Sequence, residues 1–309
     1  MITVTLNPSI DRRYNIKDFE RGKVFRADDF QYTPGGKGLN VAKIIKTLGE
    51  PVVATGFLGG KSGSYIREKL NEMNIEHKFL SIDGETRSCL AIISDDGSQT
   101  EILESGPLIL EKDMDGFYNL YKELIEDEEI ICISGSMPKD IDIDTYKNLI
   151  EIANKEGKKV LLDTSGEALK KGMEGKPYLI KPNKEELEAI VGNSISTEDD
   201  VIKGVSAIIK NGINIIAVSL GKEGCLVFND NYMYRVTIPK VTAVNPVGSG
   251  DAMIAGFAVS LKRNYEFENM IKLAAACGTA NALEKETGKV DINNINSLIN
   301  HIIIEKIKL

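Results

Sequence analysis

Residues 245 to 261 read Asn245-Pro-Val-Gly-Ser-Gly-Asp251, followed directly by Ala-Met-Ile-Ala-Gly-Phe-Ala-Val-Ser-Leu261. The second part is apolar on almost every side, which predicts a helix buried all round rather than an amphipathic surface helix. The N-terminus of such a helix points into the protein. Gly248, Ser249 and Gly250 let successive backbone N–H groups converge on one point without an intervening side chain. Together with the positive end of the helix dipole, they form a candidate anion site.

Asp251 lies at the mouth of this candidate anion site. An acidic residue at the start of a helix can serve only as an N-cap, because the free amides and the dipole already attract negative charge there. It can also act as a base toward a molecule that the anion site holds. The stretch alone leaves both interpretations open, and the rest of the chain distinguishes them.

The composition is that of an ordinary soluble protein. The chain has 309 residues, of which 42% are hydrophobic and 27% are charged. This length suits one large domain or one domain with an appendage. The net charge of -8 argues against nonspecific nucleic-acid binding, which needs a basic face. We therefore expect no nucleic-acid partner, and any bound phosphate must be held by local groups.

The cysteines and histidines do not form a metal-binding pattern. Cys89, Cys132, Cys225 and Cys277 lie far apart, and the sequence has only 2 histidines. Because no Cys-x-x-Cys or Cys/His cluster is present, we expect reduced thiols and no zinc site. The chain shows neither a basic-then-apolar leader nor an apolar run of about 18 residues. We therefore expect a cytoplasmic protein with no membrane partner.

Short continuous apolar runs alternate with helical patterns from residue 113 onward. The runs are residues 129–134, 159–163, 178–181 and 214–219. This rhythm predicts a parallel sheet covered by helices on both faces, to which residues 2–6 and 52–58 add strands. Each run ends in polar or glycine-rich residues, and ligands of open α/β sheets bind at these carboxyl ends. The predicted ligand site therefore lies along this edge.

Two polar segments with alternating apolar residues predict β-hairpins that could pair into one small sheet standing off the main body. The predicted hairpins lie within residues 12–33 and 88–103. We therefore expect a β lid formed by residues 10–33 and 87–105, and a discontinuous main domain formed by residues 1–9, 34–86 and 106–309. Nearer the C-terminus we expect a hairpin at 224–238 with its turn at 229–231, and helices at 266–284 and 293–305.

Gly35-Gly-Lys-Gly38, with Asn40 close behind, predicts a second helix N-terminus, one that carries a cation and an amide. It lacks the Gly-x-x-x-x-Gly-Lys-Ser/Thr spacing of a Walker loop, so by itself it is equally consistent with a simple helix-starting turn. Together with the candidate anion site at 248–251, this motif suggests a protein that binds both ends of a small phosphorylated molecule. Arg26 and Arg87 lie in the two hairpins, where a guanidinium group could hold phosphate or remain solvated.

Six short motifs occur in order along the chain: Asn7-Pro-x-x-Asp11, Gly35-Gly-Lys-Gly-x-Asn40, Gly135-Ser-Met-Pro138, Lys181-Pro-Asn-x-x-Glu186, Ser219-Leu-Gly-x-x-Gly224 and Asn245-Pro-Val-Gly-Ser-Gly-Asp251. In this order they resemble the ribokinase-like phosphofructokinase-B family of sugar kinases, over nearly the whole chain. The resemblance implies an α/β fold, with a three-layer α/β/α main domain and a small β-sheet lid. Residues 84–89 and 99–107 look most like the branch that phosphorylates sugar phosphates, tagatose-6-phosphate kinases first and 1-phosphofructokinases next.

The resemblance also implies a role for each motif. Asp251 would take the proton from a sugar hydroxyl, and Gly248, Ser249 and Gly250 would face the transferred phosphoryl group. The residues expected to hold the sugar and its phosphate are Asp11, Gly36, Lys37, Asn40, Arg87, Arg26 and Ser136. The residues expected near ATP are Asn183, Ser219, Gly221, Gly224 and Asn281. Glu186 would act on Mg²⁺ through water, since ATP and solvent supply most magnesium ligands.

The expected reaction is ATP-dependent conversion of tagatose 6-phosphate to tagatose 1,6-bisphosphate, and the first alternative is 1-phosphofructokinase activity. The lid would cover the sugar and pair with a second lid in a homodimer. The intact Asp251 and glycine turn disfavour a non-catalytic sugar-phosphate sensor. A dinucleotide-dependent oxidoreductase is disfavoured because the first strand ends in Asn7-Pro8 and not in Gly-x-Gly-x-x-Gly.

Two features depart from the usual family pattern: the pair Arg12-Arg13 beside Asp11, and Ala252 after Asp251. The two arginines bear on substrate preference.

Overall fold

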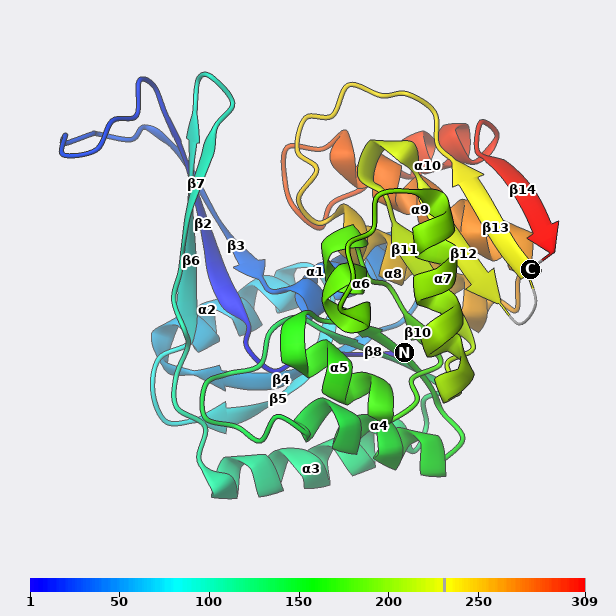
Figure 1. Ribbon diagram of the computed structural model, residues 1–309. Coiled ribbons are helices and arrows are strands. Elements are labelled where there is room, and N and C mark those ends of the chain that lie inside the picture. Colours follow the sequence, from blue (N-terminus) through cyan, green and yellow to red (C-terminus); the bar gives the residue numbers. More distant parts are fainter. Residues whose placement is uncertain (230–231, 309) are drawn as a thin grey trace.

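The computed structural model describes residues 1–229 and 232–308, which form a large α/β body and a slender projecting sheet (Figure 1). Within these residues the body contains a 10-stranded sheet. In spatial order its strands are β14 (Ile303–Lys308), β13 (Tyr232–Thr237), β12 (Cys225–Asn229), β11 (Ile215–Ser219), β10 (Leu179–Ile180), β9 (Lys159–Asp163), β8 (Ile130–Ser134), β1 (Ile2–Thr5), β4 (Val53–Gly59) and β5 (Glu76–Ile82). From β11 to β5 all neighbours are parallel, and β12, β13 and β14 continue the sheet in antiparallel pairing.

Helices cover both faces of this sheet. They are α1 (Lys37–Thr47), α2 (Gly60–Glu72), α3 (Glu111–Ile125), α4 (Thr145–Lys155), α5 (Gly166–Glu174), α6 (Lys184–Val191), α7 (Glu198–Ile208), α8 (Ser249–Lys262), α9 (Phe267–Ala282) and α10 (Ile292–Ile299), with 3-10 turns η1 (Ile209–Asn211) and η2 (Gly221–Glu223). One core includes side chains of α1, α2, α8, α9 and α10, and the other those of α3 to α7. Successive side chains of a strand point to opposite faces, so Cys132 of β8 enters the first core and Ile131 and Ile133 enter the second. The predicted three-layer fold is confirmed.

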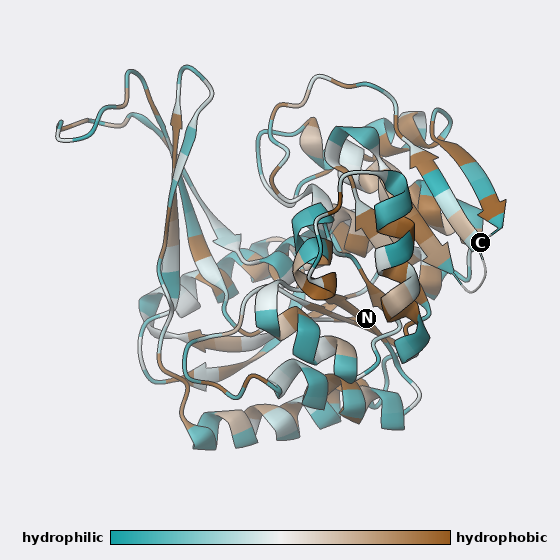
Figure 2. Cartoon of the chain, viewed as in Figure 1, coloured by the Kyte–Doolittle hydropathy of each residue, from teal (hydrophilic) through white to brown (hydrophobic). Residues whose placement is uncertain are grey.

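Hydropathy follows the layers. Apolar residues concentrate in the main sheet and on the helix surfaces turned toward it, whereas the outer helix surfaces are largely polar (Figure 2). No helix within residues 1–229 and 232–308 is both long enough and apolar enough to cross a membrane. The helix predicted from residues 252–261 is α8, and its residues from Asp251 to Ser260 are all buried.

Close packing places the N-terminus of α8 beside that of α1. α8 lies against both α1 and α9. At Gly256 a Cβ atom would come within 2.6 Å of the Cα atom of Ala274 on α9, so the approach of the two helices requires glycine at this position. α8 is enclosed from Asp251 onward, and its half-buried start opens onto the carboxyl edge of the sheet.

The C-terminal segment corrects the sequence-based prediction. Residues 293–305 are not one helix, because α10 ends at Ile299 and β14 begins at Ile303. β14 pairs antiparallel with β13, which places Ile304 opposite Val236. A run of β-branched isoleucines favours a strand once a free sheet edge is available, and helical periodicity carries no information about that edge. The predicted hairpin at 224–238 corresponds to β12 and β13, but its turn residues Asp230 and Asn231 lie outside the described residues.

The projecting sheet, hereafter the lid, has four strands among the described residues. In spatial order they are β3 (Asp29–Gly35), β2 (Ser9–Ile16), β6 (Arg87–Ser94) and β7 (Gln99–Leu103). β2 pairs antiparallel with β3, and β6 with β7, which confirms both predicted hairpins. The hairpins join through parallel pairing of β2 with β6, where Asp11 lies opposite Cys89. In Figure 1 the lid rises from the body beside the carboxyl ends of the central strands.

Candidate active site

A cavity of about 710 Å³ lies between the lid and the carboxyl edge of the main sheet. Its body wall is formed by the N-termini of α1 and α8 and by the loops after β1, β8, β9 and β10. Its lid wall is formed by residues of β2, β3, β6 and β7. The predicted site residues that line it are Asp11, Gly36, Lys37, Asn40, Arg87, Ser136, Asn183, Glu186, Ser219, Gly248, Gly250 and Asp251. Most of the residues chosen from the sequence therefore meet in one place.

The first turn of α8 has the features of an anion site. Gly248 precedes the helix with a φ of 87°, a left-handed conformation that favours glycine. The amide of Ser249 donates to the Pro246 carbonyl at 3.2 Å, whereas the amides of Gly248, Gly250 and Asp251 donate to no acceptor among the described residues. Three unpaired N–H groups at a helix N-terminus suit an anionic oxygen. The Ser249 side chain does not line the cavity.

Asp251 is almost enclosed, with 4% of its surface exposed. Burial raises the pKa of its carboxyl group to about 6, and the nearby Asp163 carboxylate acts in the same direction. Lys37, a hydrogen bond from Asn40 and Lys181 oppose this rise. A carboxylate with a raised pKa in a cavity is a better proton acceptor than an exposed one, so the site favours the interpretation of Asp251 as a base over that of a simple cap.

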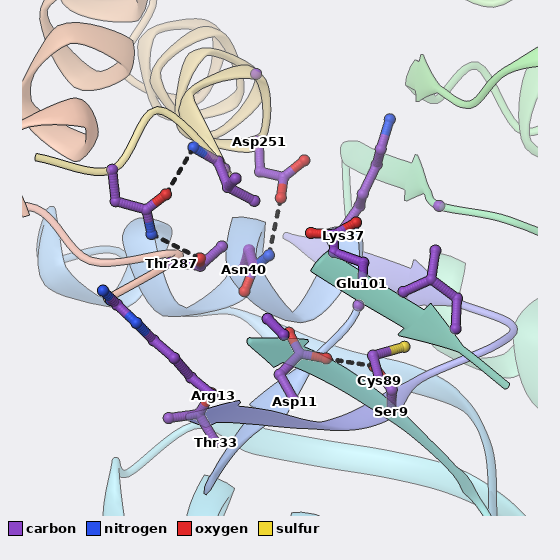
Figure 3. A pocket seen from close by; sticks show the side chains of 18 of the residues that line it. Ser9, Asp11, Arg13, Thr33, Lys37, Asn40, Cys89, Glu101, Asp251 and Thr287 are labelled. Atoms are coloured by element: carbon purple, nitrogen blue, oxygen red, sulfur yellow. Dashed lines mark hydrogen bonds between the residues drawn. The ribbon is translucent and has the colours of Figure 1, made fainter. Parts of the chain in front are cut away.

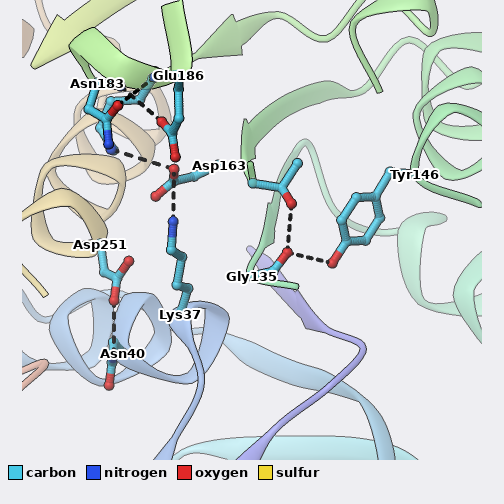
Figure 4. A network of polar contacts seen from close by, with 10 residues as sticks. Lys37, Asn40, Gly135, Tyr146, Asp163, Asn183, Glu186 and Asp251 are labelled. Carbon is cyan, nitrogen blue, oxygen red and sulfur yellow. Dashed lines mark hydrogen bonds and ion pairs between the residues drawn. The ribbon is translucent and has the colours of Figure 1, made fainter. Parts of the chain in front are cut away.

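The first turn of α1 orients this carboxylate. Gly36 precedes α1 with a φ of 107°, and the Nδ2 group of Asn40 donates to Oδ2 of Asp251 at 2.9 Å (Figure 4). Both side chains are largely buried at the cavity wall, so the bond joins the two helix N-termini where solvent has little access. Lys37 projects from the same turn toward Asp163, with Nζ 3.5 Å from Oδ1. The two glycine-containing motifs therefore form one structural unit.

Two charged groups at this edge, Asp163 and Lys181, were expected from the sequence only as residues at the ends of strands that line the site, without a role of their own. Asp163 ends β9, and its Oδ1 atom lies 3.5 Å from Nζ of both Lys37 and Lys181. Asp163 and Lys181 are buried and line the cavity. Oδ2 of Asp163 has no hydrogen-bond partner among the described residues. The available signal was their place at the carboxyl ends of neighbouring strands, which marks site residues in open α/β sheets.

The lid wall contributes the carboxylates of Asp11 and Glu101 and the guanidinium group of Arg13 (Figure 3), as well as that of Arg87. The Ser9 hydroxyl donates to Oδ1 of Asp11 at 2.7 Å, and burial raises the pKa of the Asp11 carboxyl group. Arg87 donates to the Asn7 carbonyl at 3.1 Å and to the Glu104 carbonyl at 3.0 Å, which holds the lid to the body. Arg13 reaches from β2 to the Lys285 carbonyl on the opposite side of the cavity.

Glycine at position 35 is required by the Asp11 carboxylate. A Cβ atom there would lie 2.0 Å from the Cγ atom of Asp11. The sequence singled out this glycine as part of a helix-starting turn, but Gly35 belongs to the end of β3, and α1 begins at Lys37. The first glycine of the motif therefore makes room for a lid carboxylate, and the second turns the chain into the helix.

Of the residues predicted to lie near ATP, some line the cavity and others do not. Asn183 caps α6: its side chain accepts from the Glu186 amide at 2.7 Å, and Glu186 accepts in return from the Asn183 amide at 2.9 Å. Both residues line the cavity, as does Ser219. Gly221 and Gly224 lie in and beside η2, away from the cavity lining. Asn183 and Glu186 therefore cap a helix and line the cavity at the same time.

Asn281 and Arg26 lie away from the cavity. Asn281 is 0% exposed, so it has no surface to offer to a nucleotide, and we revise its expected role to a structural one. Its Nδ2 group donates to the Val247 carbonyl at 2.9 Å, and its Oδ1 atom accepts from the Gly288 amide at 3.1 Å. Asn281 therefore supports the glycine turn from behind. Arg26 lies between β2 and β3 in the lid and does not line the cavity.

Comparisons with known proteins agree with this geometry. A family model described as pfkB family carbohydrate kinase matches residues 4–293. The chain is similar to a Staphylococcus aureus protein provisionally named a phosphofructokinase, with 31% identity and a TM-score of 0.85 over 100% of this chain and 99% of that one. It is also similar to Escherichia coli phosphofructokinase-2 in complex with potassium, with 28% identity and a TM-score of 0.91 over 97% and 98% of the two chains.

A third similar structure comes from Thermotoga maritima and is provisionally named a 1-phosphofructokinase. The identity is 29% and the TM-score 0.91, over 99% of each chain. The Escherichia coli enzyme has also been solved in complex with fructose-6-phosphate and as a tetrameric inhibited form. These matches extend over both the body and the lid, because each covers at least 97% of the present chain.

Proposed function

The chain belongs to the pfkB family of carbohydrate kinases and is an ATP-dependent sugar-phosphate kinase, and we propose that it phosphorylates a free hydroxyl of a ketohexose phosphate. The observation that carries this proposal is the buried Asp251 carboxylate, oriented by Asn40 beside three unpaired amides at the start of α8. This places a base and an oxyanion site within one helical turn. Phosphoryl transfer to an alcohol needs both.

Each part of the α8 turn has a distinct task in this proposal. Because Oδ2 of Asp251 accepts from Asn40, the remaining oxygen is available to take the proton of the sugar hydroxyl. The amides of Gly248, Gly250 and Asp251 stabilise charge on the phosphoryl oxygens without having to reorganise, since the helix already fixes them. Bound substrates that fill the cavity would exclude water from the same point, which limits hydrolysis.

We assign the sugar and its phosphate to the side of the cavity that the lid faces. Asp11 and Asn40 hold sugar hydroxyls, and Gly36 lets the backbone approach them. Lys37, Arg87 and Ser136 converge on the cavity and supply cations and a hydroxyl for the phosphate. Arg13 adds a second guanidinium group on the same lid face. Arg26 takes part only if it reaches the cavity of a partner.

ATP supplies the phosphoryl group, and the residues at the carboxyl edge suit it. Asn183, Glu186 and Ser219 line this side of the cavity, and the cations of Lys37 and Lys181 neutralise part of a polyphosphate charge. No cluster of three His, Cys, Asp or Glu residues that could hold a metal occurs among the described residues. Mg²⁺ is therefore expected to bind chiefly through phosphate oxygens and water, with the Glu186 carboxylate orienting a water molecule.

Tagatose 6-phosphate is our first candidate substrate, giving tagatose 1,6-bisphosphate, and fructose 1-phosphate is the second. The first rests on the likeness of residues 84–89 and 99–107 to tagatose-6-phosphate kinases. The second is supported by the similarity to the Thermotoga maritima protein. The two ketose phosphates differ in the end that carries phosphate, so a cavity with cations on several sides suits both.

We also propose that the lid mediates a homodimer. Its outer face carries Phe30, Tyr32 and Ile102, all of them exposed apolar or aromatic side chains. Tyr14 packs against both aromatic rings, with ring centroids 6.1 Å from Phe30 and 6.2 Å from Tyr32, and the Phe30 and Tyr32 centroids are 5.5 Å apart. An exposed aromatic cluster on a thin sheet is typical of an interaction surface. Molecular mass in solution, measured by light scattering, tests this point.

The activity test is a coupled ADP-release assay with MgATP. It compares kcat/KM for tagatose 6-phosphate, fructose 1-phosphate and fructose 6-phosphate. A preference for tagatose 6-phosphate supports the first candidate, and a preference for fructose 1-phosphate or fructose 6-phosphate keeps the mechanism and changes the substrate. Saturable sugar-phosphate binding without turnover of any of the three would contradict the proposal and favour a sensor.

A further inference from the structure

Lys43 is a buried cation that does not touch the cavity. It lies on α1, one turn after Asn40, and only 8% of its surface is exposed. Its ammonium group donates to the Pro34 carbonyl at 3.1 Å and to the Thr287 carbonyl at 3.2 Å. Buried lysines are rare because removing the charge from water is costly unless hydrogen bonds compensate. Lys43 is absent from the cavity lining, so direct contact with a substrate does not explain it.

The two carbonyl groups come from segments that are far apart in the sequence. Pro34 lies in β3, where the lid joins the body. Thr287 lies in residues 283–288, hereafter the linking loop, which follows α9. Arg13 makes a second connection between the same two parts, from β2 of the lid to the Lys285 carbonyl of the linking loop. Lys43 therefore fastens the base of the lid to the linking loop. The same loop is contacted by Arg13 of the lid at Lys285.

The linking loop is also bound to the glycine turn. Asn281 joins the Gly288 amide to the Val247 carbonyl with bonds of 3.1 and 2.9 Å. Asn245 adds a contact from the turn side, with Nδ2 3.2 Å from the Lys285 carbonyl and 3.3 Å from the Thr287 hydroxyl. A displacement of the loop would therefore be transmitted to the start of α8.

The linking loop packs directly on the pair formed by Asn40 and Asp251. At Gly288 a Cβ atom would come within 2.7 Å of Oδ1 of Asn40 and 2.9 Å of Cε of Lys43. Asn40 in turn donates to Asp251 at 2.9 Å. The ammonium group of Lys43 thus holds the loop against the side chain that orients the proposed base.

The pKa of Lys43 is lowered overall, and three carboxylates around it oppose this shift. Burial lowers the pKa of Lys43, but Asp11 of the lid, Glu286 of the linking loop and Asp251 of α8 all act in the opposite direction. These three carboxylates come from the three parts that Lys43 connects. A charged donor also makes stronger hydrogen bonds to carbonyl oxygens than a neutral one.

We propose that Lys43 is a positioning residue for phosphoryl transfer, holding the lid base, the linking loop and the Asn40–Asp251 pair in one arrangement. This inference rests on the proposed kinase function. Because Lys43 does not line the cavity, it acts on the alignment of the reacting groups and has little influence on ground-state binding. Small misplacements of such groups are costly for the rate, by about 10²-fold for 1 Å.

The test replaces Lys43 by methionine, which keeps the chain length and removes the charge. We expect kcat of Lys43→Met to fall about 10- to 100-fold while KM for MgATP and for the sugar phosphate changes less than about threefold. ADP release without sugar should rise relative to transfer, because the lid base is less firmly held. Lys43→Arg, which can donate to both carbonyl groups, should recover most of kcat. Lys46→Met is the matched control, since Lys46 is exposed on the same helix.

Gly288→Ala is a second variant that keeps the lysine and displaces the linking loop. It should lower kcat with little change in KM, and it keeps the test decisive if Lys43→Met does not fold. Wild-type kcat in folded Lys43→Met, a loss confined to KM, or wild-type kcat in Gly288→Ala would overturn the inference. Absence of turnover in the wild-type protein with all three sugar phosphates would instead contradict the proposed function.

Discussion

The two walls of the cavity differ in how their polar groups are held. On the body wall, Asp251, Asp163 and Lys181 are buried and lie within a network of bonded or charged neighbours. On the lid wall, Arg87 is half-buried and Glu101 is exposed, on strands whose outer face meets solvent. Buried, interconnected groups keep one geometry, whereas groups on a thin sheet can move with it. We therefore assign the chemical step to the body wall and substrate retention to the lid wall.

The strongest test of this division is Asp251→Asn. It removes the proposed base but keeps a side chain of the same shape that can still accept from Asn40. We expect kcat to fall about 10²- to 10⁴-fold, as is typical when a general base is lost. The Kd for the sugar phosphate, measured by calorimetry, should change little. Asp29→Asn in the exposed part of the lid is the control, and equal losses in both variants would contradict the assignment of Asp251.

Gly248→Ala tests the anion site on the same wall. Its φ of 87° disfavours a side chain, and a Cβ atom would approach Cγ2 of Thr287 to 2.7 Å. We expect kcat to fall about 10- to 100-fold, since displaced amides no longer face the phosphoryl oxygens. Gly49→Ala is a matched control, with a φ of 88° and nothing within 4 Å of the added atom.

The Gly49→Ala control separates backbone strain from displacement of the amides. It should cost about 1 kcal/mol of stability, measured by urea unfolding, and leave kcat unchanged. If Gly248→Ala lowered stability by a similar amount and left kcat unchanged as well, the amides at the start of α8 would have no part in the chemical step.

On the lid wall, Arg87→Gln should raise KM for the sugar phosphate about tenfold with a smaller change in kcat. The guanidinium group supplies charge to the cavity, and its bonds to the Asn7 and Glu104 carbonyls also fix the lid base. Arg26→Gln should leave both constants unchanged if each cavity works alone. A rise in KM for Arg26→Gln that appears only in dimeric protein would show that a partner lid contributes to the site.

The smallest expected effect is a shift of the acid limb of the pH–rate profile. Asp251 must be ionised to accept a proton, so kcat/KM should decrease as the pH falls through about 6. Asp163 helps to raise this pKa and Lys37 opposes the rise. The limb should therefore move to lower pH in Asp163→Asn and to higher pH in Lys37→Met.

The test is the direction in which the acid limb shifts in each variant relative to the wild-type protein. The phosphate groups of the substrates titrate in the same range, with a second pKa near 6, but they are identical in every assay. Shifts of the same sign in Asp163→Asn and Lys37→Met would contradict the electrostatic account of Asp251.

Local sequence was sufficient for most of the fold. Continuous apolar runs predicted β8, β9 and β11, because strands buried on both faces need apolar residues at every position. The apolar sequence after Asp251 predicted the burial of α8. The strand β14 was missed, because its isoleucine run becomes a strand only through pairing with β13, a partner about 70 residues away in sequence.

The sequence by itself determined which residues could do the chemistry, and the tertiary structure decided which of them are connected. The glycine motifs predicted two helix N-termini, since glycine spacing and helix dipoles are local properties. Nothing local joined Asn40 to Asp251, Asp163 to Lys181, or Lys43 to the linking loop. Nor did local pattern show that Asn281 is a buried support for the glycine turn. Such contacts join residues that the chain separates, and only packing of α1, α8 and the lid around one cavity brings them together.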